Sequence, residues 1–333
     1  MKHLFLSMLL ASGLISCSAP KNLTNDSIIQ KFTNEVSEAE LKKQLYIIAS
    51  DEMQGRDAGK ESERMAGDYL KNYYEKLEID SPTSEGYFQV IPANTFKRVA
   101  GEMRNVMAFI KGSEKPEEIL VLSAHYDHEG IKNGQIYNGA DDDGSGTVAV
   151  MEIARVMKEA QKKGKGPKRS ILFLHVSGEE KGLLGSRYYS ENPIFQLENT
   201  IANVNIDMIG RVDDEHKNKE NYVYIIGSDM LSSDLDRIVR QANNYVKINL
   251  DEKYNTKSDP NRFYYRSDHY NFAKNGIPSV FYFNGVHADY HQPSDTPDKI
   301  AYNLLAKRTQ LIFSTVWLLA NSEERPKVDK TED

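Results

Sequence analysis

Acidic and histidine residues follow four largely apolar segments of the sequence, each at the point where the segment ends. The segments are 119–124, 171–177, 201–206 and 280–283, and the residues that follow them are His125, Glu179, Glu180, Asp207, His287 and His291. Continuous apolar runs of this kind are typical of strands that are buried on both faces of a parallel sheet. Because the carboxyl ends of parallel strands meet at one edge of a sheet, we expect these side chains to form one site there.

A further acidic cluster lies in segment 139–146, whose sequence is Gly-Ala-Asp-Asp-Asp-Gly-Ser-Gly and which directly precedes a predicted helix at Thr147. Taken alone, acidic residues before a helix are commonly explained by the positive end of the helix dipole. A pair such as Glu179 and Glu180 is commonly a solvent-exposed turn, and a single histidine usually has a structural role. The joint placement of all these residues at one sheet edge is what indicates a catalytic site.

The residue types at this edge indicate a metal site. The chain contains one cysteine, which excludes an internal disulfide framework, a cysteine-rich zinc module and an iron–sulfur cluster. Imidazole and carboxylate ligands suit zinc or a similar divalent ion. Three carboxylates and two imidazoles are too many for one tetrahedral ion that keeps a water, and they suit two ions that share one bridging carboxylate. A buried cluster of carboxylates without cations would also repel itself.

At these residues the sequence resembles the co-catalytic di-zinc metallopeptidases, the family that includes bacterial leucyl aminopeptidases, aminopeptidase Y, glutamate carboxypeptidase and glutaminyl cyclase. The resemblance covers about residues 37–320 and rests on several ordered motifs. These motifs are Ala124-His-Tyr-Asp-His128, Gly139-Ala-Asp-Asp-Asp-Gly-Ser-Gly146, Gly178-Glu-Glu180, Asn205-Ile-Asp-Met208, Arg266-Ser-Asp-His269 and Tyr290-His-Gln-Pro-Ser-Asp-Thr296. The upstream stretch Ala49–Arg56 also fits the family pattern.

The resemblance implies the ligands of two zinc ions per chain, with other divalent ions as an alternative. Asp142, the middle residue of the aspartate triplet, would bridge the two ions. His125 and Asp207 would complete one metal site. Glu180 and His291 would complete the other.

The resemblance also implies the roles of residues beside the metals. Glu179 would be the general base, and Asp127 would hold the imidazole of His125 in its metal-binding tautomer. Tyr264 would hydrogen-bond the developing oxyanion, although the adjacent Tyr265 could take that place. The implied activity is that of a zinc-dependent exopeptidase acting on peptides with a free N-terminus. In that mechanism a metal-bridging water, activated by Glu179, attacks the peptide bond after the N-terminal residue.

Three other functions remain open for the same residues. A carboxypeptidase would need a cationic side chain for a terminal carboxylate, and Arg266 is the candidate. A glutaminyl cyclase, which is an acyltransferase, operates in this family with one zinc, so a full set of ligands for two ions argues against it. A non-catalytic binding protein with this fold would be expected to have lost ligands, whereas this sequence retains all of them and the base.

Helices and strands alternate along the chain, which predicts the sheet that positions the site. Ser37-Glu-Ala-Glu40 is a capping box, and apolar residues follow it at helical spacing. Further helices are expected over 65–77, 147–158, 181–189, 233–246 and 303–319, and strands over 105–112, 119–122, 171–176, 201–206, 222–226 and 278–283. We therefore expect a single-domain α/β fold. It would be an α/β/α sandwich with a mostly parallel twisted sheet, helices on both faces and the metal site at the carboxyl ends of the strands.

Composition and charge limit the class of protein. Of the 333 residues, 39% are hydrophobic and 27% are charged, which excludes a disordered chain and a multispanning membrane protein. The formal net charge is −7, and a nucleic-acid partner is therefore not expected, because its phosphates would need a basic surface.

The N-terminal segment predicts export and lipid attachment. Residues 1–16 combine Lys2 with a short apolar run and are interpreted as a lipoprotein signal peptide. Leu14-Ile-Ser-Cys17 resembles the bacterial lipoprotein cleavage box, so Cys17 would become the lipid-modified first residue. We expect the protein to be extracytoplasmic and to touch a bacterial membrane only through this anchor. Residues 17–36 are expected to form a flexible tether, 37–321 the di-zinc peptidase catalytic domain and 322–333 a disordered tail.

Overall fold

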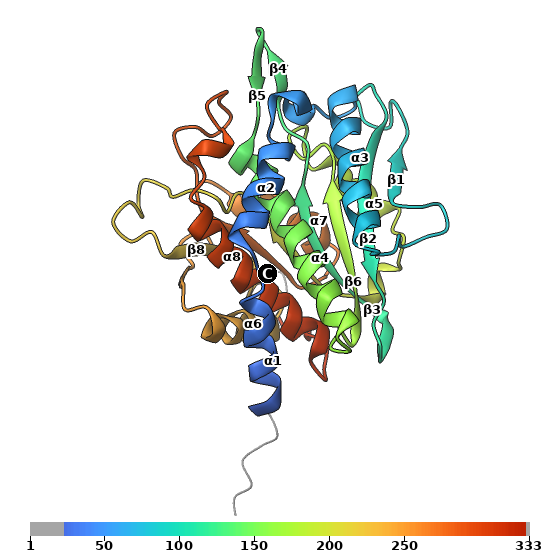
Figure 1. The fold of residues 1–333 in the computed structure, drawn as a ribbon, viewed down its shortest axis with the longest axis vertical. Coiled ribbons are helices and arrows are strands. Elements are labelled where there is room, and N and C mark those ends of the chain that lie inside the picture. The colour runs from blue at the N-terminus through green and yellow to red at the C-terminus, as the bar shows by residue number, and fades with distance from the viewer. Residues whose placement is uncertain (1–22, 331–333) are drawn as a thin grey trace, which may run out of the picture.

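The structure is a computed structural model in which residues 23–330 are described. A mixed sheet with the strand order β1-β2-β6-β3-β7-β10-β8-β9 forms its centre (Figure 1). The strands are β1 (Phe88–Ile91), β2 (Met103–Ile110), β3 (Lys115–His125), β6 (Arg169–Val176), β7 (Thr200–Ile206), β8 (Tyr222–Ile226), β9 (Asn249–Asp251) and β10 (Ser279–Phe283). The central strands β6, β3, β7 and β10 pair in parallel, whereas β1, β2 and β8 run antiparallel to their inner neighbours. The predicted mostly parallel sheet is confirmed.

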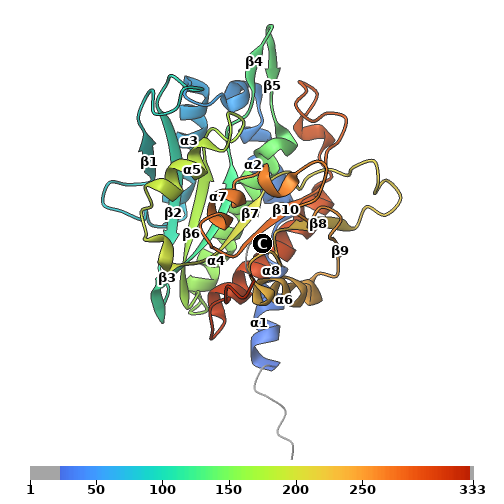
Figure 2. The ribbon, with the colours of Figure 1, turned by 180° about the vertical axis from the view of Figure 1, so that it is seen from behind.

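Helices cover both faces of this sheet, which confirms the predicted layers (Figures 1 and 2). They are α1 (Leu23–Thr33), α2 (Glu38–Ile48), α3 (Glu61–Lys76), α4 (Gly146–Lys162), α5 (Leu184–Glu191), α6 (Ser233–Ala242), α7 (His269–Ala273) and α8 (Tyr302–Asn321). Alternate residues of β3 face opposite layers, as the pleat of a strand requires. Leu120 and Leu122 belong to the core shared with α2, α3, α4 and α8, whereas Val121 packs in a second core with Tyr189 of α5 and Phe272 of α7.

The predicted capping box at the start of α2 is present, with one partner exchanged. The hydroxyl of Ser37 accepts a hydrogen bond from the main-chain N–H of Glu40 at 3.2 Å. The return bond comes from another helix, because the main-chain N–H of Ser37 donates to Oε1 of Glu152 at 2.7 Å. Glu152 lies in α4, so the cap also ties α2 to α4.

Two segments that were expected to be unstructured are ordered where the structure describes them. The predicted tether 17–36 contains α1, in which Ile29 and Phe32 are buried and the Phe32 ring stacks on Trp317 of α8 at 5.4 Å. The predicted tail 322–333 is held up to residue 330, and Arg325 donates to the main-chain oxygen of Thr200 at 3.3 Å. Both predictions were wrong for these residues. The tail is held by hydrogen bonds and ion pairs. Such polar contacts do not require a periodic apolar pattern, so the sequence of the tail gave no sign of its order.

A short hairpin of β4 (Gly130–Lys132) and β5 (Gln135–Tyr137) projects from the end of the molecule opposite to α1 (Figures 1 and 2). Short helical segments complete the loops; they are η1 (Asp51–Arg56), η2 (Ala140–Ser145), η3 (Leu197–Asn199), η4 (Asn243–Tyr245), η5 (Phe263–Tyr265) and η6 (Pro297–Lys299). The hairpin begins just after His128, so it marks the end of the sheet at which the polar residues gather.

The predicted signal peptide and its Cys17 lie outside the described residues, and their structure is not assigned. Within residues 23–330, no helix is long and apolar enough to cross a lipid bilayer.

Candidate metal centre

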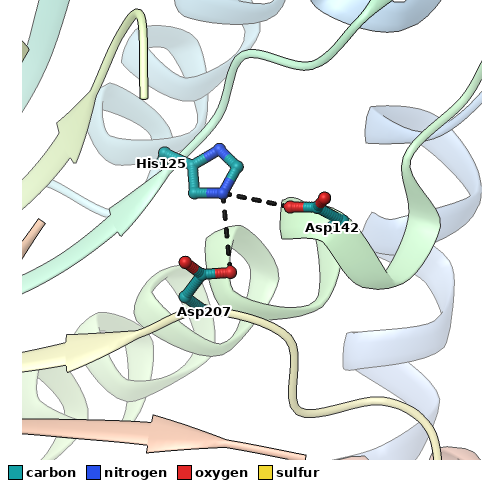
Figure 3. Close-up of side chains that lie close together, drawn as sticks. All are labelled: His125, Asp142 and Asp207. Carbon is teal, nitrogen blue, oxygen red and sulfur yellow. Dashed lines mark ion pairs between the residues drawn. The ribbon is translucent and has the colours of Figure 1, made fainter. Parts of the chain in front are cut away.

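The loops at the carboxyl ends of the central strands bring the predicted site residues together. Strand β3 ends at His125, and Asp207 directly follows β7. The remaining predicted ligands follow β6 and β10 or lie in η2, and they are Glu180, His291 and Asp142. Figure 3 shows the side chains of His125, Asp142 and Asp207 pointing toward one another.

Asp142 lies between two groups of candidate ligands. Its Oδ1 is 3.2 Å from Nε2 of His125, and the same nitrogen is 3.6 Å from Oδ1 of Asp207 (Figure 3). Its Oδ2 is 3.0 Å from Nε2 of His291, which lies 3.1 Å from Oε2 of Glu180. The five predicted ligands therefore form two groups that share Asp142, which is the arrangement that a bridging carboxylate requires. Their roles as ligands stay predictions.

The atoms at the centre of these groups lack ordinary hydrogen bonds. Nε2 of His125, Oδ2 of Asp142 and Oε1 of Glu180 are buried and have no hydrogen-bond partner among the described residues. Each lies close to another polar atom of the site, at 3.2 Å from Oδ1 of Asp142, 3.0 Å from Nε2 of His291 and 2.8 Å from Nδ1 of His128 respectively, but without the alignment of a hydrogen bond. Leaving buried polar or charged groups unpaired is strongly unfavourable. The donor set therefore fits divalent cations, which would supply the missing partners.

The three aspartates of segment 141–143 have different contacts: two bind main-chain N–H groups of the loops, and one faces the site. Oδ1 of Asp141 accepts from the main-chain N–H of Gly210 at 2.6 Å. Oδ1 of Asp143 accepts from the N–H of Gly146 at 2.9 Å and from that of Met208 at 3.0 Å. The interpretation that acidic residues satisfy the start of the helix therefore holds for Asp143. Asp142 is left to face the two ligand groups.

A chain of hydrogen bonds fixes the orientation of Asp207. The hydroxyl of Ser267 donates to Oδ2 of Asp207 at 2.7 Å, and Nδ2 of Asn205 donates to that hydroxyl at 2.8 Å. Oδ1 of Asn205 in turn accepts from the hydroxyl of Ser123 at 2.7 Å. All of these side chains are buried. Oδ2 of Asp207 is thus occupied, and Oδ1 remains directed at His125.

The structure shows which group of Asp127 contacts His125. Nδ1 of His125 lies 3.1 Å from the main-chain oxygen of Asp127, whereas the nearest carboxylate oxygen of Asp127 is 3.8 Å away. The carboxylate accepts instead from the main-chain N–H of Glu179 at 3.1 Å. Asp127 was predicted to hold the imidazole of His125 in its metal-binding tautomer. The group of Asp127 within hydrogen-bonding distance of Nδ1 is its carbonyl oxygen, and the role itself stays a prediction.

Glu179 lies beside the first ligand group. Its Oε2 is 4.0 Å from Nε2 of His125, and its side chain is 12% exposed. Burial raises the pKa of Glu179 well above its ordinary value; the positive imidazole of His125 opposes this shift, and the carboxylates of Asp207, Glu180 and Asp268 add to it. A carboxyl group with a raised pKa at the edge of a cleft is suited to accept and return a proton. Its role as the base stays a prediction.

The structure does not support the predicted oxyanion role of Tyr264. Its side chain is 1% exposed and packs against the rings of Tyr265, His269 and Tyr270. Neither Tyr264 nor Tyr265 is among the residues that line the cleft beside the ligands. The tyrosine on that wall is Tyr290, whose ring stacks on His291 at 3.9 Å.

The cleft beside the ligands is mostly apolar. Asp142, Glu179 and Asp207 contribute to it, and the other lining residues are Met208, Phe263, Arg266, Phe281, Phe283, Val286 and Tyr290. The guanidinium of Arg266 lies over the ring of Phe263 at 5.0 Å and makes no ion pair with a described carboxylate. The cleft wall therefore combines an apolar surface with one guanidinium.

Two histidines of the motifs have positions that the sequence did not assign. His128 is fully buried, and its Nδ1 lies 2.8 Å from Oε1 of Glu180. The sequence feature that points to His128 is its position three residues after His125, at the end of the same strand. His287 follows β10 as expected, but its Nε2 lies 3.0 Å from Oδ2 of Asp141, outside both ligand groups.

Comparisons with known proteins agree with the motifs. The sequence model of Peptidase family M28 matches residues 105–316. A probable aminopeptidase of Saccharomyces cerevisiae is 25% identical over 306 residues, which cover 89% of this chain and 77% of that protein. The aminopeptidase YwaD of Bacillus subtilis is 29% identical over 233 residues, or 66% of this chain and 46% of that protein. A probable zinc metalloprotease of Pyrenophora tritici-repentis is 28% identical over 264 residues, or 67% and 53%. The chain spans about half the length of the last two relatives.

Solved structures share the fold. The aminopeptidase LapA of Legionella pneumophila has a TM-score of 0.69 at 21% identity and covers 93% of this chain and 79% of its own. A glutaminyl cyclase of Porphyromonas gingivalis has a TM-score of 0.65 at 19% identity and covers 84% and 97%. At these identities the likeness concerns the fold alone, and the fold does not distinguish a peptidase from a cyclase.

Proposed function

Because this chain belongs to Peptidase family M28, we propose that it is a zinc-dependent aminopeptidase that removes the N-terminal residue of peptides. The observation that carries the proposal is the pair of ligand groups joined by Asp142, with Glu179 beside them. The names of relatives support it, because the yeast and Bacillus proteins are described as aminopeptidases.

In the proposed reaction, five side chains would bind the two ions and Glu179 would transfer the proton. Asp142 would hold both ions, with His125 and Asp207 on one and Glu180 and His291 on the other. Bound zinc supplies Lewis acidity, which polarises the scissile carbonyl and stabilises the negative charge that develops on it. The carboxylate of Glu179 would take a proton from the attacking water and pass it to the leaving amine.

The cleft supports a substrate with a free, positively charged N-terminus. Asp142, Glu179 and Asp207 line the cleft next to its apolar wall. Of these, Glu179 is not assigned to an ion and would attract the ammonium group, and the wall of Phe263, Phe281 and other apolar residues would accept the first side chain. We therefore expect apolar N-terminal residues to be preferred.

A panel of substrates tests the proposal. It contains aminoacyl chromogenic amides, the same amides with a blocked N-terminus, and peptides that begin with glutamine, each assayed with and without a metal chelator. We expect hydrolysis of the free amides only, abolished by the chelator and restored by zinc. Cyclisation of the glutaminyl peptides without hydrolysis would favour the cyclase instead. Hydrolysis of blocked peptides from the C-terminal end would favour the carboxypeptidase.

We also propose that the enzyme is lipid-anchored at a bacterial membrane, outside the cytoplasm. The support is the pattern of Lys2, the short apolar run and Leu14-Ile-Ser-Cys17. Helix α1, the first described element after this segment, lies at the end of the molecule opposite to the β4–β5 hairpin (Figure 1). Mass spectrometry of the native N-terminus tests this. An intact Met1 on protein from the cytosolic fraction would contradict it.

A further inference from the structure

We infer that His128 is an additional ligand of the ion held by Asp142, Glu180 and His291. That ion would then have four protein ligands, whereas the ion held by His125, Asp142 and Asp207 would have three. The inference rests on the zinc-binding part of the proposed function. It makes the two metal positions unequal, because one would have four protein ligands and the other three.

The position of the His128 ring carries the inference. Its Nδ1 lies 2.8 Å from Oε1 of Glu180 and 3.9 Å from Oδ2 of Asp142. The side chain is fully buried, and neither ring nitrogen has a hydrogen-bond partner among the described residues. The contact with Glu180 is short without being aligned as a hydrogen bond. Atoms that converge in this way without bonding one another are placed as ligands of a common ion would be.

Contacts of the main chain and of the ring itself restrict the position of His128. The main-chain N–H of His128 donates to the carbonyl of Arg56 at 3.2 Å. On another side the ring lies against Gly139, where a Cβ atom would come within 2.4 Å of Cγ of His128. Gly139 has a φ of 55°, so glycine is favoured there for its backbone as well as for its size. A ligand whose orientation is fixed before the metal arrives binds with less loss of entropy.

Arg56 fixes the segments on both sides of the ring. Its buried guanidinium donates to the main-chain oxygens of Tyr126 at 2.7 Å, Asn138 at 2.6 Å and Gly139 at 2.9 Å. A fourth bond, of 2.8 Å, goes to the carbonyl of Ile48. Burial lowers the pKa of this guanidinium to about 10, so it remains a cation at neutral pH. The loop with Gly139 and the strand end with His128 are thereby held to one another.

Glu129 is a weaker candidate for the same role. Its Oε1 is 3.8 Å from Nδ1 of His291, so it is close to the second ligand group. Its carboxylate, however, already has cationic partners, because it pairs with Lys132 and lies 3.9 Å from Nζ of Lys181. The ring nitrogens of His128 have no such partner among the described residues, and a bound ion would supply one.

X-ray absorption at the zinc edge, together with a crystal structure of the zinc-loaded wild-type protein, tests the inference directly. We expect Nδ1 of His128 at ~2.0–2.1 Å from one zinc, the usual zinc–imidazole distance. Absorption should report imidazole from His125, His128 and His291. A hydrogen bond from His128 to Glu180, with the zinc ligated by imidazole of His125 and His291 alone, would overturn the inference.

Zinc titration of the metal-free protein against a chromogenic chelator gives a second measure that does not depend on activity. His128→Asn can still donate a hydrogen bond to Glu180 but is a poor zinc ligand. We expect it to weaken one of the two sites by more than ~100-fold, beyond the 10–100-fold loss usual for residues outside the coordination sphere. His216→Asn is the matched control, since His216 is also buried but pairs with Asp213 at 2.8 Å, apart from both ligand groups.

The outcomes separate the inference from the proposed function. Equal zinc affinities in wild type and His128→Asn, with both sites filled, would overturn the inference and leave the aminopeptidase intact. No zinc bound by the wild-type protein would overturn the proposed function itself. Circular dichroism shows whether the variant folds. If it does not, the absorption and crystal data on the wild-type protein still decide.

Discussion

The buried carboxylate of Asp127 accepts a hydrogen bond from the main-chain N–H of Glu179 at 3.1 Å. This contact joins the end of β3 to the turn after β6, so it sets where the proposed base stands relative to His125. Burial raises the pKa of Asp127 to about 8, and the neighbouring cationic form of His125 opposes that rise. The carboxylate acts on the base through its backbone and does not touch the cleft.

Removing this contact should slow the reaction without removing the metals. We expect Asp127→Ala to lower kcat by ~10–100-fold, the usual effect of losing a residue that positions the site. Asp127→Asn keeps an oxygen that can accept from Glu179, so it should restore most of the rate. Metal content and kcat are measured on both variants. Equal loss of rate in both would show that the charge of Asp127, and not its hydrogen bond, is what matters.

The adjacent residues Glu179 and Glu180 should respond differently to the same substitution. Glu179→Gln retains shape but cannot accept a proton, so turnover should fall by ~10²–10⁴ while both ions stay bound. Glu180→Gln should weaken one metal site, and added zinc should restore part of its activity. Kinetics and metal analysis are done on the two variants side by side. Near-wild-type turnover in Glu179→Gln with metals bound would show that the base is another residue.

The number of ions per chain is a separate expectation. Two ligand groups joined by Asp142 predict two zinc ions per chain after reconstitution, measured by elemental analysis of the purified protein. Mild chelation should remove the ion at His125 and Asp207 first, because the other group, with His128 added as inferred above, would have one more protein ligand. A content that never exceeds one ion per chain would contradict the two-metal site and favour a cyclase.

Arg266 distinguishes the aminopeptidase from a carboxypeptidase. The guanidinium stands on the cleft wall over Phe263 and pairs with no described carboxylate, so it is available to a substrate carboxylate. For an aminopeptidase, Arg266→Met should leave the hydrolysis of neutral aminoacyl amides near the wild-type rate. The matched assay uses peptides with a blocked N-terminus and a free C-terminus. Cleavage of these by the wild type, lost in Arg266→Met, would establish the carboxypeptidase.

The buried side chain of His175 should make the free energy of unfolding fall at acidic pH. Burial lowers its pKa from 6.5 to about 3, and its Nε2 lies 2.6 Å from the hydroxyl of Tyr74. The folded protein therefore binds fewer protons than the unfolded chain between these values, so stability is complete above about pH 6.5 and is lost as the pH falls toward 3. The loss is about 1.4 kcal/mol of unfolding free energy per pH unit for this group.

Denaturant unfolding of metal-free wild type and His175→Gln at several pH values measures this effect. The variant is expected to be less stable at pH 7 but to lose stability less steeply on acidification. Parallel curves for the two proteins would show that His175 is already protonated in the fold, and would contradict the expectation.

The positions of the candidate ligands could be predicted from sequence because their signals are local. An apolar strand and the polar residue at its end are adjacent in the chain, so the sequence alone places His125 and Asp207 at the sheet edge. The parallel order of the central strands then brings them together. The sheet itself follows from the same apolar runs.

Other features depend on side-chain direction within loops, which spacing does not encode. Tyr264 lies in η5, its ring packs in an aromatic cluster, and it is not among the residues that line the cleft. Asp127 uses its carbonyl on one neighbour and its carboxylate on another, a division that the residue type cannot reveal. The order in the last residues rests on contacts such as Arg325 with Thr200, between segments far apart in the chain.

The four hydrogen bonds from Arg56 to main-chain carbonyl oxygens indicate which residues a working fragment of this protein must contain. The family model begins at residue 105, yet Arg56 contributes the only described side-chain cation that binds the carbonyls of Tyr126, Asn138 and Gly139. A fragment cut to residues 105–316 would lack the guanidinium that binds the carbonyls of Tyr126, Asn138 and Gly139, and with it one tie between these two segments. A working piece of this protein is therefore expected to include Arg56, which lies well before residue 105, where the family model begins.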